Sequence, residues 1–329
     1  MHSRFHWNGC WHKVMNSLSS EKAKLIKNEA VKIGFDACGF AEAAEVSEEA
    51  KKRFQNWLEA GYCAEMEYMR RYEDIRYNPC LLVEKARSII VVALNYFPAE
   101  KQPASHPQFA YYAYGEDYHT VMKKKLAELF SFLLRIAPDT QGRYFTDTAP
   151  IMEKYWAQQA GIGFIGRNTQ LIIPHKGSYF FLGVIVSTLA LPPDIPQQNR
   201  CGNCRKCIDA CPTGALSIST GLNANKCLSY QTIENRSELP QSIISNIGNR
   251  VYGCDTCQQV CPYNRFAVPS SVPEFRPHPE FLQLDYERMQ TLSSEEYRML
   301  FKNSAVKRAK YEGLKRNIAV LTTKNKKHF

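Results

Sequence analysis

The stretch Cys201-Gly-Asn-Cys204-Arg-Lys-Cys207-Ile-Asp-Ala-Cys211-Pro212 determines how this chain is interpreted. A second run, Cys254-Asp-Thr-Cys257-Gln-Gln-Val-Cys261-Pro262, repeats its ending, and Cys227 lies between the two. Two intervening residues let successive thiolates converge on one iron–sulfur cluster from a single tight loop. The last cysteine of such a run, followed by proline, normally binds the other cluster in two-cluster ferredoxins. The spacing therefore predicts two [4Fe–4S] sites that exchange a ligand.

Each predicted cluster receives four thiolates, and none of the cysteines in this region is left over. The first set is Cys201, Cys204, Cys207 and Cys261, and the second is Cys211, Cys227, Cys254 and Cys257. Paired Cys-x-x-Cys units also suit tetrahedral zinc. Zinc sites need neither the third cysteine at the same spacing nor the two Cys-Pro endings, so clusters are favoured. A disulfide framework is disfavoured, because the cysteines are clustered and a chain of 329 residues does not need covalent staples.

Length and composition predict one large domain and a smaller one. With 44% hydrophobic residues the chain can build a core, and no apolar run approaches the roughly 20 residues that span a bilayer. The start of the chain lacks the apolar segment of a signal peptide, and reduced cysteines favour the cytosol. We expect a disordered extension over 1–18, a catalytic domain over 19–195, a ferredoxin-like domain over 196–265 and a basic helical segment over 266–329.

Hydrophobic patterning predicts an α+β fold for the large domain. An opening helix should end at Gly34, and Ser88–Leu94 is a compact strand signal. The apolar stretch from Tyr179 to Leu191 is short and rich in β-branched residues, which predicts a buried strand. Helices are expected over 121–134 and over 152–160.

The formal net charge of +10 is concentrated near the C-terminus. Between Lys307 and Lys327 there are eight basic residues and one acid, Glu312. Apolar residues recur there at near-helical spacing, so one face of a helix can pack while the other stays basic. A solvated helix face and a nucleic-acid contact surface are both compatible with this pattern.

Few motifs in the large domain indicate chemistry. Gly161-Ile-Gly-Phe-Ile-Gly166 formally matches a dinucleotide fingerprint, but it follows a predicted helix where the motif requires a strand, so a Rossmann site is disfavoured. Asp147, in Tyr144-Phe-Thr-Asp-Thr-Ala-Pro150, precedes a predicted helix. From the residues alone, an N-cap is favoured there over a general acid.

Several ordered motifs, taken together, resemble the epoxyqueuosine reductase family. They are Thr146–Pro150, Ala160–Phe164 and Gly177–Leu182, followed by the two cysteine runs. Gly115-Glu-Asp-Tyr-His119, Asn225-Lys-Cys-Leu-Ser-Tyr230 and the block from Ile247 to Cys257 match as well, so that the resemblance spans about residues 19 to 321.

The resemblance implies an enzyme of queuosine biosynthesis. Its members reduce epoxyqueuosine, at the wobble position of certain tRNAs, to queuosine. Two electrons and two protons enter and water leaves. The family uses cob(II)alamin reduced through two [4Fe–4S] clusters, with Asp147 at the position of the proton donor. A proton-donating carboxyl at neutral pH needs a desolvated site, so we expect Asp147 to be buried. The resemblance also implies a monomer that receives electrons from a flavodoxin or ferredoxin.

The same resemblance implies which residues contact cobalamin. Arg76 is expected near the corrin amides or phosphate, the segment from Asn168 to Ile173 along the corrin, and Ser229 with Cys254 and Asp255 on the cluster side. The expected cofactor contacts are Arg76, Asp147, Asn168, Leu171, Ile173, Leu182, Ser229, Cys254 and Asp255. His119 follows Asp117 as Asp-x-His, but Met122 stands where a lower-ligand motif needs glycine, so no cobalt ligation is assigned to it.

The resemblance further implies an order for the two clusters. The second set of cysteines faces the cobalamin, and the first set receives electrons from outside. Where longer family members carry a helical-repeat extension, this sequence stops after Leu321, which shifts tRNA binding onto the basic residues. Two other functions stay open, a reductive dehalogenase-like enzyme that acts on a small molecule, and a ferredoxin fused to a domain of different purpose.

Overall fold

Four antiparallel strands form the central sheet of this computed structural model, which describes residues 8–325 and side chains from Leu18 to Thr323. The strand order is β1-β2-β7-β4. The strands are β1 (Ala37–Glu42), β2 (Ser88–Asn95), β7 (Phe180–Ser187) and β4 (Gly142–Phe145). Every residue of β2 is buried, because both faces of the sheet are covered. This confirms the strands predicted from the two apolar stretches, and the antiparallel pairing agrees with an α+β fold.

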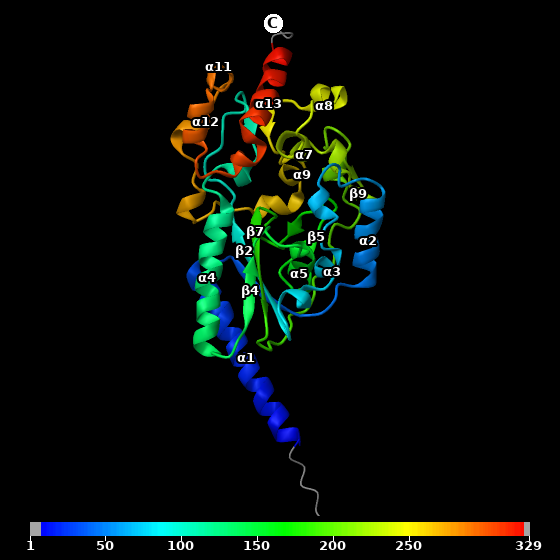
Figure 1. The fold of residues 1–329 in the computed structure, drawn as a ribbon, viewed down its shortest axis with the longest axis vertical. Coiled ribbons are helices and arrows are strands. Elements are labelled where there is room, and N and C mark those ends of the chain that lie inside the picture. The colour runs from blue at the N-terminus through cyan, green and yellow to red at the C-terminus, as the bar shows by residue number, and fades with distance from the viewer. Residues whose placement is uncertain (1–7, 326–329) are drawn as a thin grey trace, which may run out of the picture.

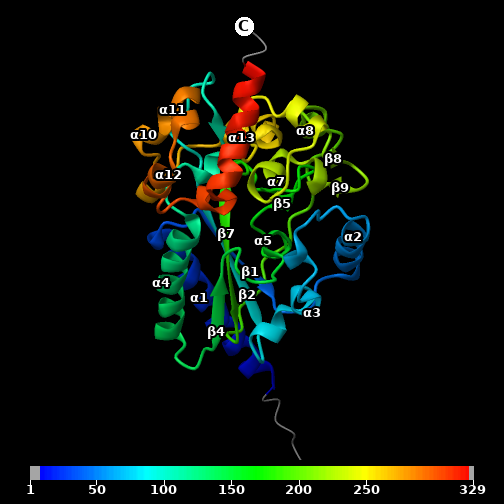
Figure 2. The ribbon, with the colours of Figure 1, turned by 45° about the horizontal axis from the view of Figure 1, so that its top comes forward.

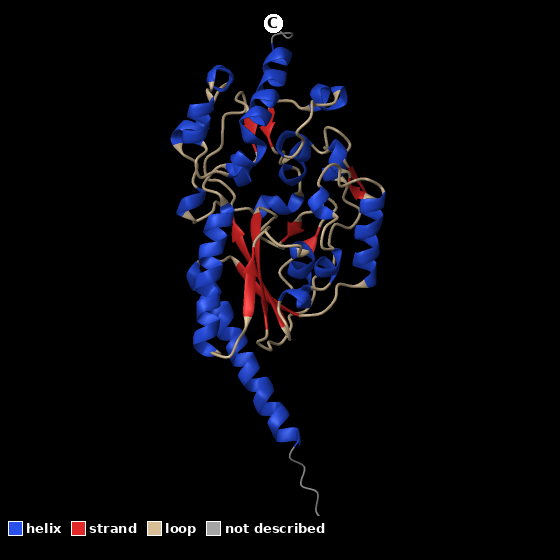
Figure 3. Cartoon of the chain, in the orientation of Figure 1, coloured by secondary structure: helices blue, strands red, loops and turns tan. Residues whose placement is uncertain are grey.

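Helices cover both faces of the sheet (Figures 1 and 3). Alternate residues of β2 point to opposite faces. Ile90 and Val92 pack in a core with α1 (Asn8–Ile33) and α4 (Tyr118–Ile136), whereas Ile89 and Val91 pack in a second core with α5 (Glu153–Gln159). The sheet therefore lies between two hydrophobic cores, and the ends of its strands can contact the remaining segments of the chain.

The predicted helices are present, with one correction at the start of the chain. Gly34 follows the end of α1 at a φ of +99°, as expected for a glycine that terminates a helix. The helix begins at Asn8, so the expected disordered extension is wrong for residues 8–18. Residues 1–7 lie outside the described part of the chain.

Glycines allow close backbone packing beside α5. A Cβ on Gly163 would lie 2.5 Å from the carbonyl oxygen of Ile172, and one on Gly161 would lie 2.8 Å from that of Ile195. These glycines precede the small hairpin of β5 (Phe164–Ile165) and β6 (Leu171–Ile172). The glycine spacing is explained by this packing, in agreement with the sequence argument against a dinucleotide site. Two further helices, α2 (Glu48–Glu59) and α3 (Glu73–Tyr77), lie on the same side of the molecule (Figure 1).

Each cysteine run leads into a single-turn helix, α6 (Lys206–Asp209) in the first and α9 (Thr256–Gln259) in the second. Between these runs the chain forms β8 (Leu216–Ser217), β9 (Gly221–Leu222), α7 (Leu228–Ile233), α8 (Gln241–Asn246) and β10 (Arg250–Tyr252). Helices α6 and α9 contact each other. The two runs, about fifty residues apart in sequence, therefore lie together in space.

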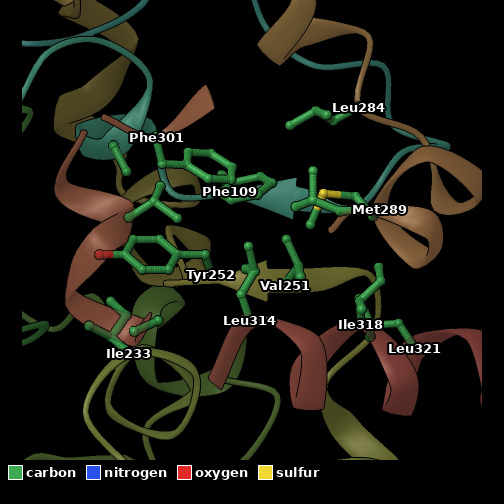
Figure 4. Close-up of a cluster of buried hydrophobic side chains, with 14 of the residues drawn as sticks. Phe109, Ile233, Val251, Tyr252, Leu284, Met289, Phe301, Leu314, Ile318 and Leu321 are labelled. Carbon is green, nitrogen blue, oxygen red and sulfur yellow. The ribbon is translucent and has the colours of Figure 1, made fainter. Parts of the chain in front are cut away.

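A third hydrophobic core joins segments that are far apart in sequence. It gathers Phe109 of β3 (Gln108–Phe109), Tyr252 of β10, and Leu314 and Ile318 of the last helix (Figure 4). Strands β3 and β10 pair in parallel. The C-terminal helices are α10 (Pro279–Leu282), α11 (Tyr286–Thr291), α12 (Ser294–Leu300) and α13 (Lys310–Asn325). Figure 2 shows α13 beside α7. The segments expected at 196–265 and 266–329 therefore share one core.

Candidate active site and cluster-binding cavities

A large cavity lies where the sheet meets the cysteine-bearing segment. Tyr96 follows β2, Thr146 follows β4 and Phe180 begins β7, so one end of the sheet supplies one wall. The other wall comes from loops around Cys211, Ser229 and Asp255. Its empty space, including the part open to solvent, is about 1400 Å³. The antiparallel topology places these strand ends together, and no sequence motif spans them.

The eight cysteines divide between two cavities in the two predicted sets. The large cavity is lined by Cys211, Cys227, Cys254 and Cys257. A second cavity is lined by Cys201, Cys204, Cys207 and Cys261. In each case one cysteine comes from the other run, as the ligand-exchange pattern predicts. Cluster binding by these thiols stays a prediction, but the structure has the grouping that it requires.

Burial disfavours thiolates at the cysteines of the large cavity. It raises the pKa of Cys227 to about 11, and it raises the pKa of Cys257 further above the ordinary value of 9. Neighbouring cysteines of the same set add to both shifts. Bound metal ions reverse this balance by stabilising thiolates. The donor set therefore fits a positively charged iron centre.

Asp147 projects from a loop between β4 and α5 and is held from two sides. The Tyr118 hydroxyl donates a hydrogen bond of 2.6 Å to its Oδ2, and the Asp147 backbone N–H donates one of 2.7 Å to Oε1 of Glu153. The residue has a φ of +50°, a left-handed conformation that is costly outside glycine. His119 Nε2 lies 4.0 Å from Oδ2. The carboxyl group is thus positioned by its neighbours at the mouth of the cavity.

Two expectations for Asp147 are wrong. It does not cap α5, since the N-cap residue is Met152 and Asp147 lies five positions earlier. The loop keeps Asp147 out of the capping position, because its backbone N–H is turned toward Glu153. Nor is the carboxyl group buried, because its side chain is 69% exposed. Its hydrogen-bond partners Tyr118 and Glu153 are half-buried.

Those groups have perturbed ionisation. Burial, and then the charge of Asp147, raises the pKa of Glu153 from 4.5 to about 8. The same two causes raise the pKa of the Tyr118 phenol far above its ordinary value. On the opposite wall, burial raises the pKa of Asp255 to about 6, although its Oδ2 accepts the Tyr111 N–H at 2.7 Å. Glu153 and Tyr118 therefore stay protonated over most of the neutral range.

The structure brings together most of the residues expected to contact a cofactor. The large cavity is lined by Asp147, Asn168, Leu182, Ser229, Cys254 and Asp255. They come from both walls, so the cavity lies between the cysteines of the second set and the Asp147 loop.

Three of the expected contacts, by contrast, do not line this cavity. Leu171 and Ile173 are buried in the hydrophobic core that includes α5, whereas Ile172 between them lines the cavity of the first cysteine set. Arg76 is 7% exposed; its guanidinium lies 5.3 Å from the Phe54 ring, and Nη2 donates to the Tyr68 carbonyl. Contacts of Arg76, Leu171 and Ile173 with a cofactor therefore stay predictions, since their side chains do not line this cavity.

The sequence did not indicate two residues of the candidate site, Tyr118 and Glu153, which hydrogen-bond with Asp147. Tyr118 lies inside the Gly115–His119 motif, directly before His119. That histidine contacts Asp117 through Nδ1 at 2.7 Å and does not line the cavity. Glu153 opens α5 six positions after Asp147, which is the only sequence signal for it.

The basic C-terminal segment is partly structural. The Arg316 guanidinium donates to the carbonyl oxygens of Gln231 and Asn235, and Arg308 pairs with Glu234 at 2.7 Å. These two charges are therefore used to attach the last helix and the turn before it to the α7 region. Lys307 and Lys310 remain exposed.

Together, the antiparallel sheet, the two cysteine sets and the acid-bearing cavity define an iron–sulfur oxidoreductase. Residues 200–264 match the family model of a 4Fe-4S double cluster binding domain, and residues 76–148 match that of epoxyqueuosine reductase QueG. Within residues 8–325, no helix is long and apolar enough to cross a membrane.

The chain belongs to the epoxyqueuosine reductase family. It is 42% identical over 297 residues to the epoxyqueuosine reductase of Cellulophaga algicola, covering 90% of this chain and 97% of that protein. A solved epoxyqueuosine reductase with an epoxyqueuosine-modified tRNA-Tyr stem loop matches with a TM-score of 0.85 and 32% identity, over 91% of this chain and 80% of that one. The Bacillus subtilis enzyme, in a structure whose catalytic aspartate loop is swung out of the active site, matches with the same values.

Proposed function

We propose that this chain reduces epoxyqueuosine to queuosine at the wobble position of tRNA, the last step of queuosine biosynthesis. One observation carries the proposal, namely that Asp147 and four cysteines line the same cavity. An acid and a source of electrons are the two requirements for converting an epoxide to an alkene and water. A family member bound to an epoxyqueuosine-modified stem loop supports tRNA as the substrate, in preference to a halogenated small molecule.

Two [4Fe–4S] clusters would be held by the two cysteine sets and would transfer single electrons at low potential. Cob(II)alamin would occupy the large cavity, where its reduced cobalt centre supplies a strong nucleophile. Asn168, Leu182, Ser229 and Asp255 line that cavity and would contact it. Because the second cysteine set borders the same space, we assign the first set to electron entry. A low-potential donor of the flavodoxin or ferredoxin type would deliver the electrons.

Asp147 would donate a proton to the epoxide oxygen. Its exposed carboxyl group can reach a substrate at the cavity mouth, and a bound tRNA would supply the burial that the protein alone does not. The Tyr118 hydroxyl can stabilise the carboxylate that remains once the proton has left. Glu153 holds the loop through the Asp147 backbone, so that the carboxyl group keeps its direction.

The organisation expected from the sequence completes the proposal. We assign residues 19–195 to cobalamin binding and catalysis, residues 196–265 to the clusters, and the remainder to a helical segment whose exposed lysines contact tRNA. The enzyme would act as a monomer in the cytoplasm, where its substrate tRNA is found.

The test is reduction of epoxyqueuosine-containing tRNA by the full chain, reconstituted anaerobically with iron, sulfide and cobalamin. Under a strong reductant, nucleoside mass spectrometry should show conversion of epoxyqueuosine to queuosine. The same protein reconstituted without cobalamin is the control and should give none. Retention of cobalamin and clusters with no conversion would contradict the substrate assignment.

A further inference from the structure

The cavity of the first cysteine set is lined by cationic groups. Besides Cys201, Cys204, Cys207 and Cys261, its ionisable lining residues are the three arginines Arg167, Arg200 and Arg265, together with His175 and Tyr263. No aspartate or glutamate lines it within the described chain. The large cavity, in contrast, has the carboxyl groups of Asp147, Glu153 and Asp255 beside one lysine, Lys154. The two cavities therefore differ in their described ionisable lining residues, because only the large cavity has carboxyl groups.

The cationic groups of the first cavity face solvent. Arg200, Arg265 and His175 are exposed, and so are Arg205 and Lys206 at the start of α6. We call these five residues the basic rim. Its charge is largely uncompensated, because the only ion pair that it makes among the described side chains is Arg205 with Asp209, at 3.4 Å.

Neutral neighbours orient part of this surface. The Arg200 guanidinium donates to the Gln197 side-chain oxygen at 3.1 Å, and that of Arg265 lies 4.6 Å from the Phe266 ring centre. The half-buried Arg167 donates to the carbonyl of Gly202, next to Cys201. The basic rim therefore surrounds the loop that carries Cys201.

We propose that the basic rim is the docking surface for an acidic electron-transfer protein, which delivers electrons to the first cysteine set. The proposal rests on the assignment of that set to electron entry. A charged surface around a redox centre raises the encounter rate of a partner of opposite charge and orients it. An acidic partner would therefore place its own centre over the first cavity.

Two other uses of the rim predict different behaviour. Charges that tune a cluster potential act best when shielded from water, whereas Arg200 and Arg265 lie in solvent, where salt screens them. A tRNA surface would have to serve the cavity that holds Asp147, but Arg200 and Arg265 line the other one. Docking of an acidic donor accounts for both the exposure and the location.

The experiment measures how fast reduced flavodoxin, the acidic probe, reduces the clusters of the reconstituted full chain, followed by loss of visible iron–sulfur absorbance. In Arg200→Glu/Arg265→Glu, the second-order rate constant at low salt should fall by about tenfold or more, and the difference should shrink as salt is raised. Arg200→Gln/Arg265→Gln should give a smaller decrease. The control, Lys24→Glu/Lys124→Glu, makes the same charge change on α1 and α4, across the sheet, and should match the wild type.

Three comparisons keep the result decisive. Reduction by photoreduced deazaflavin, a small uncharged reductant, should be equal in all variants at equal iron content. If the rate of reduction by deazaflavin falls in the arginine variants as much as the rate with flavodoxin, the basic rim acts on the cluster itself and the proposal fails. The proposal also fails if the rate constant with flavodoxin falls equally in the arginine variant and in the lysine control. It fails as well if the arginine variant binds tRNA more weakly while its rate constant with flavodoxin is unchanged. Failure of the proposed tRNA reaction would leave these rates measurable, so the two failures are distinguishable.

Discussion

The Tyr118 hydroxyl donates a hydrogen bond of 2.6 Å to Oδ2 of Asp147, across the boundary between α4 and the loop that follows β4. The Tyr118 ring is itself fixed, since it stacks on Phe181 of β7 with ring centres 4.3 Å apart. The exposed carboxyl group is therefore tied to the buried end of the sheet.

Asp147→Asn should lower turnover of epoxyqueuosine tRNA by about a hundredfold or more, because the amide cannot donate the proton that a general acid supplies. Cluster and cobalamin content, measured by iron analysis and absorbance, should stay at the wild-type level. Asp139→Asn makes the same change at an exposed position after α4 and should be silent. Retained turnover in Asp147→Asn would remove this residue from the proton-donor role.

Tyr118→Phe should lower turnover by about tenfold to a hundredfold, because a hydrogen bond to a charged group contributes about 1.5–3 kcal/mol. The stacking on Phe181 is preserved, so the melting temperature should change little. Tyr144→Phe, on β4, removes a hydroxyl that has no described partner and serves as the control. Equal turnover in both variants would show that the hydrogen bond to Asp147 is not used.

Glu153→Gln should become more stable relative to the wild type as pH rises. Burial and the charge of Asp147 raise the pKa of Glu153 from 4.5 to about 8 in the folded protein. The folded state therefore binds the Glu153 proton more tightly than the unfolded state does. The stability that this proton contributes is fully present below pH 4.5 and is lost as the pH rises toward 8. Glutamine has no such loss and can still accept the Asp147 N–H. Melting curves between about pH 5 and 8 test the trend.

The control for this pH dependence is Glu59→Gln, at an exposed position at the end of α2. Its melting temperature should differ from that of the wild type by the same amount at every pH. A difference for Glu153→Gln that is equally constant would contradict the raised pKa.

Cysteine double variants should distinguish the interleaved ligand sets from sets that follow the sequence. Cys201→Ser/Cys261→Ser changes one set and should leave one cluster, with about half of the iron and a cluster signal in the electron paramagnetic resonance spectrum. Cys201→Ser/Cys257→Ser changes both sets and should lose both clusters. If the sets instead followed the two runs, the two variants would lose iron equally.

Arg316→Gln should lower the free energy of unfolding by about 2–4 kcal/mol, because the guanidinium bonds of α13 to the Gln231 and Asn235 carbonyls are lost. Lys307→Gln, at an exposed position of the same basic segment, should change stability by less than about 0.5 kcal/mol. It should instead weaken tRNA binding and reduce its salt dependence. The opposite pattern would show that Arg316, not Lys307, contacts tRNA.

Local patterns predicted much of this molecule. The Ser88–Leu94 run predicted a buried strand, because β-branched residues without polar interruption suit a sheet covered on both faces. Residues 152–160 and Gly34 likewise predicted a helix and a helix end, which depend only on neighbouring residues. Cysteine spacing predicted two sets of four thiols, and the same two sets line the two cavities, because the spacing of cysteines in a short loop limits which of them can converge. Cluster binding by these thiols stays a prediction.

The contacts of single side chains could not be predicted in the same way. Arg76 was expected at the cofactor but packs on Phe54, and Leu171 and Ile173 face the core, because the direction of a side chain depends on the register of its strand. Asp147 was expected as a helix cap and as a buried acid, and it is neither. Its hydrogen-bond partners come from the first turns of α4 and α5, which cover opposite faces of the sheet. The sequence does not show that the starts of these two helices meet.

The sequence by itself determined that two cysteine sets are present, how they divide, and to which family the motifs belong, since each depends on short spacings along the chain. Only the tertiary structure decided what surrounds each set. An antiparallel sheet gathers the ends of β2 and β4 with the start of β7, and so gives one cavity its acids. The other cavity has the basic rim. That difference between the lining residues of the two cavities arises from packing between distant segments.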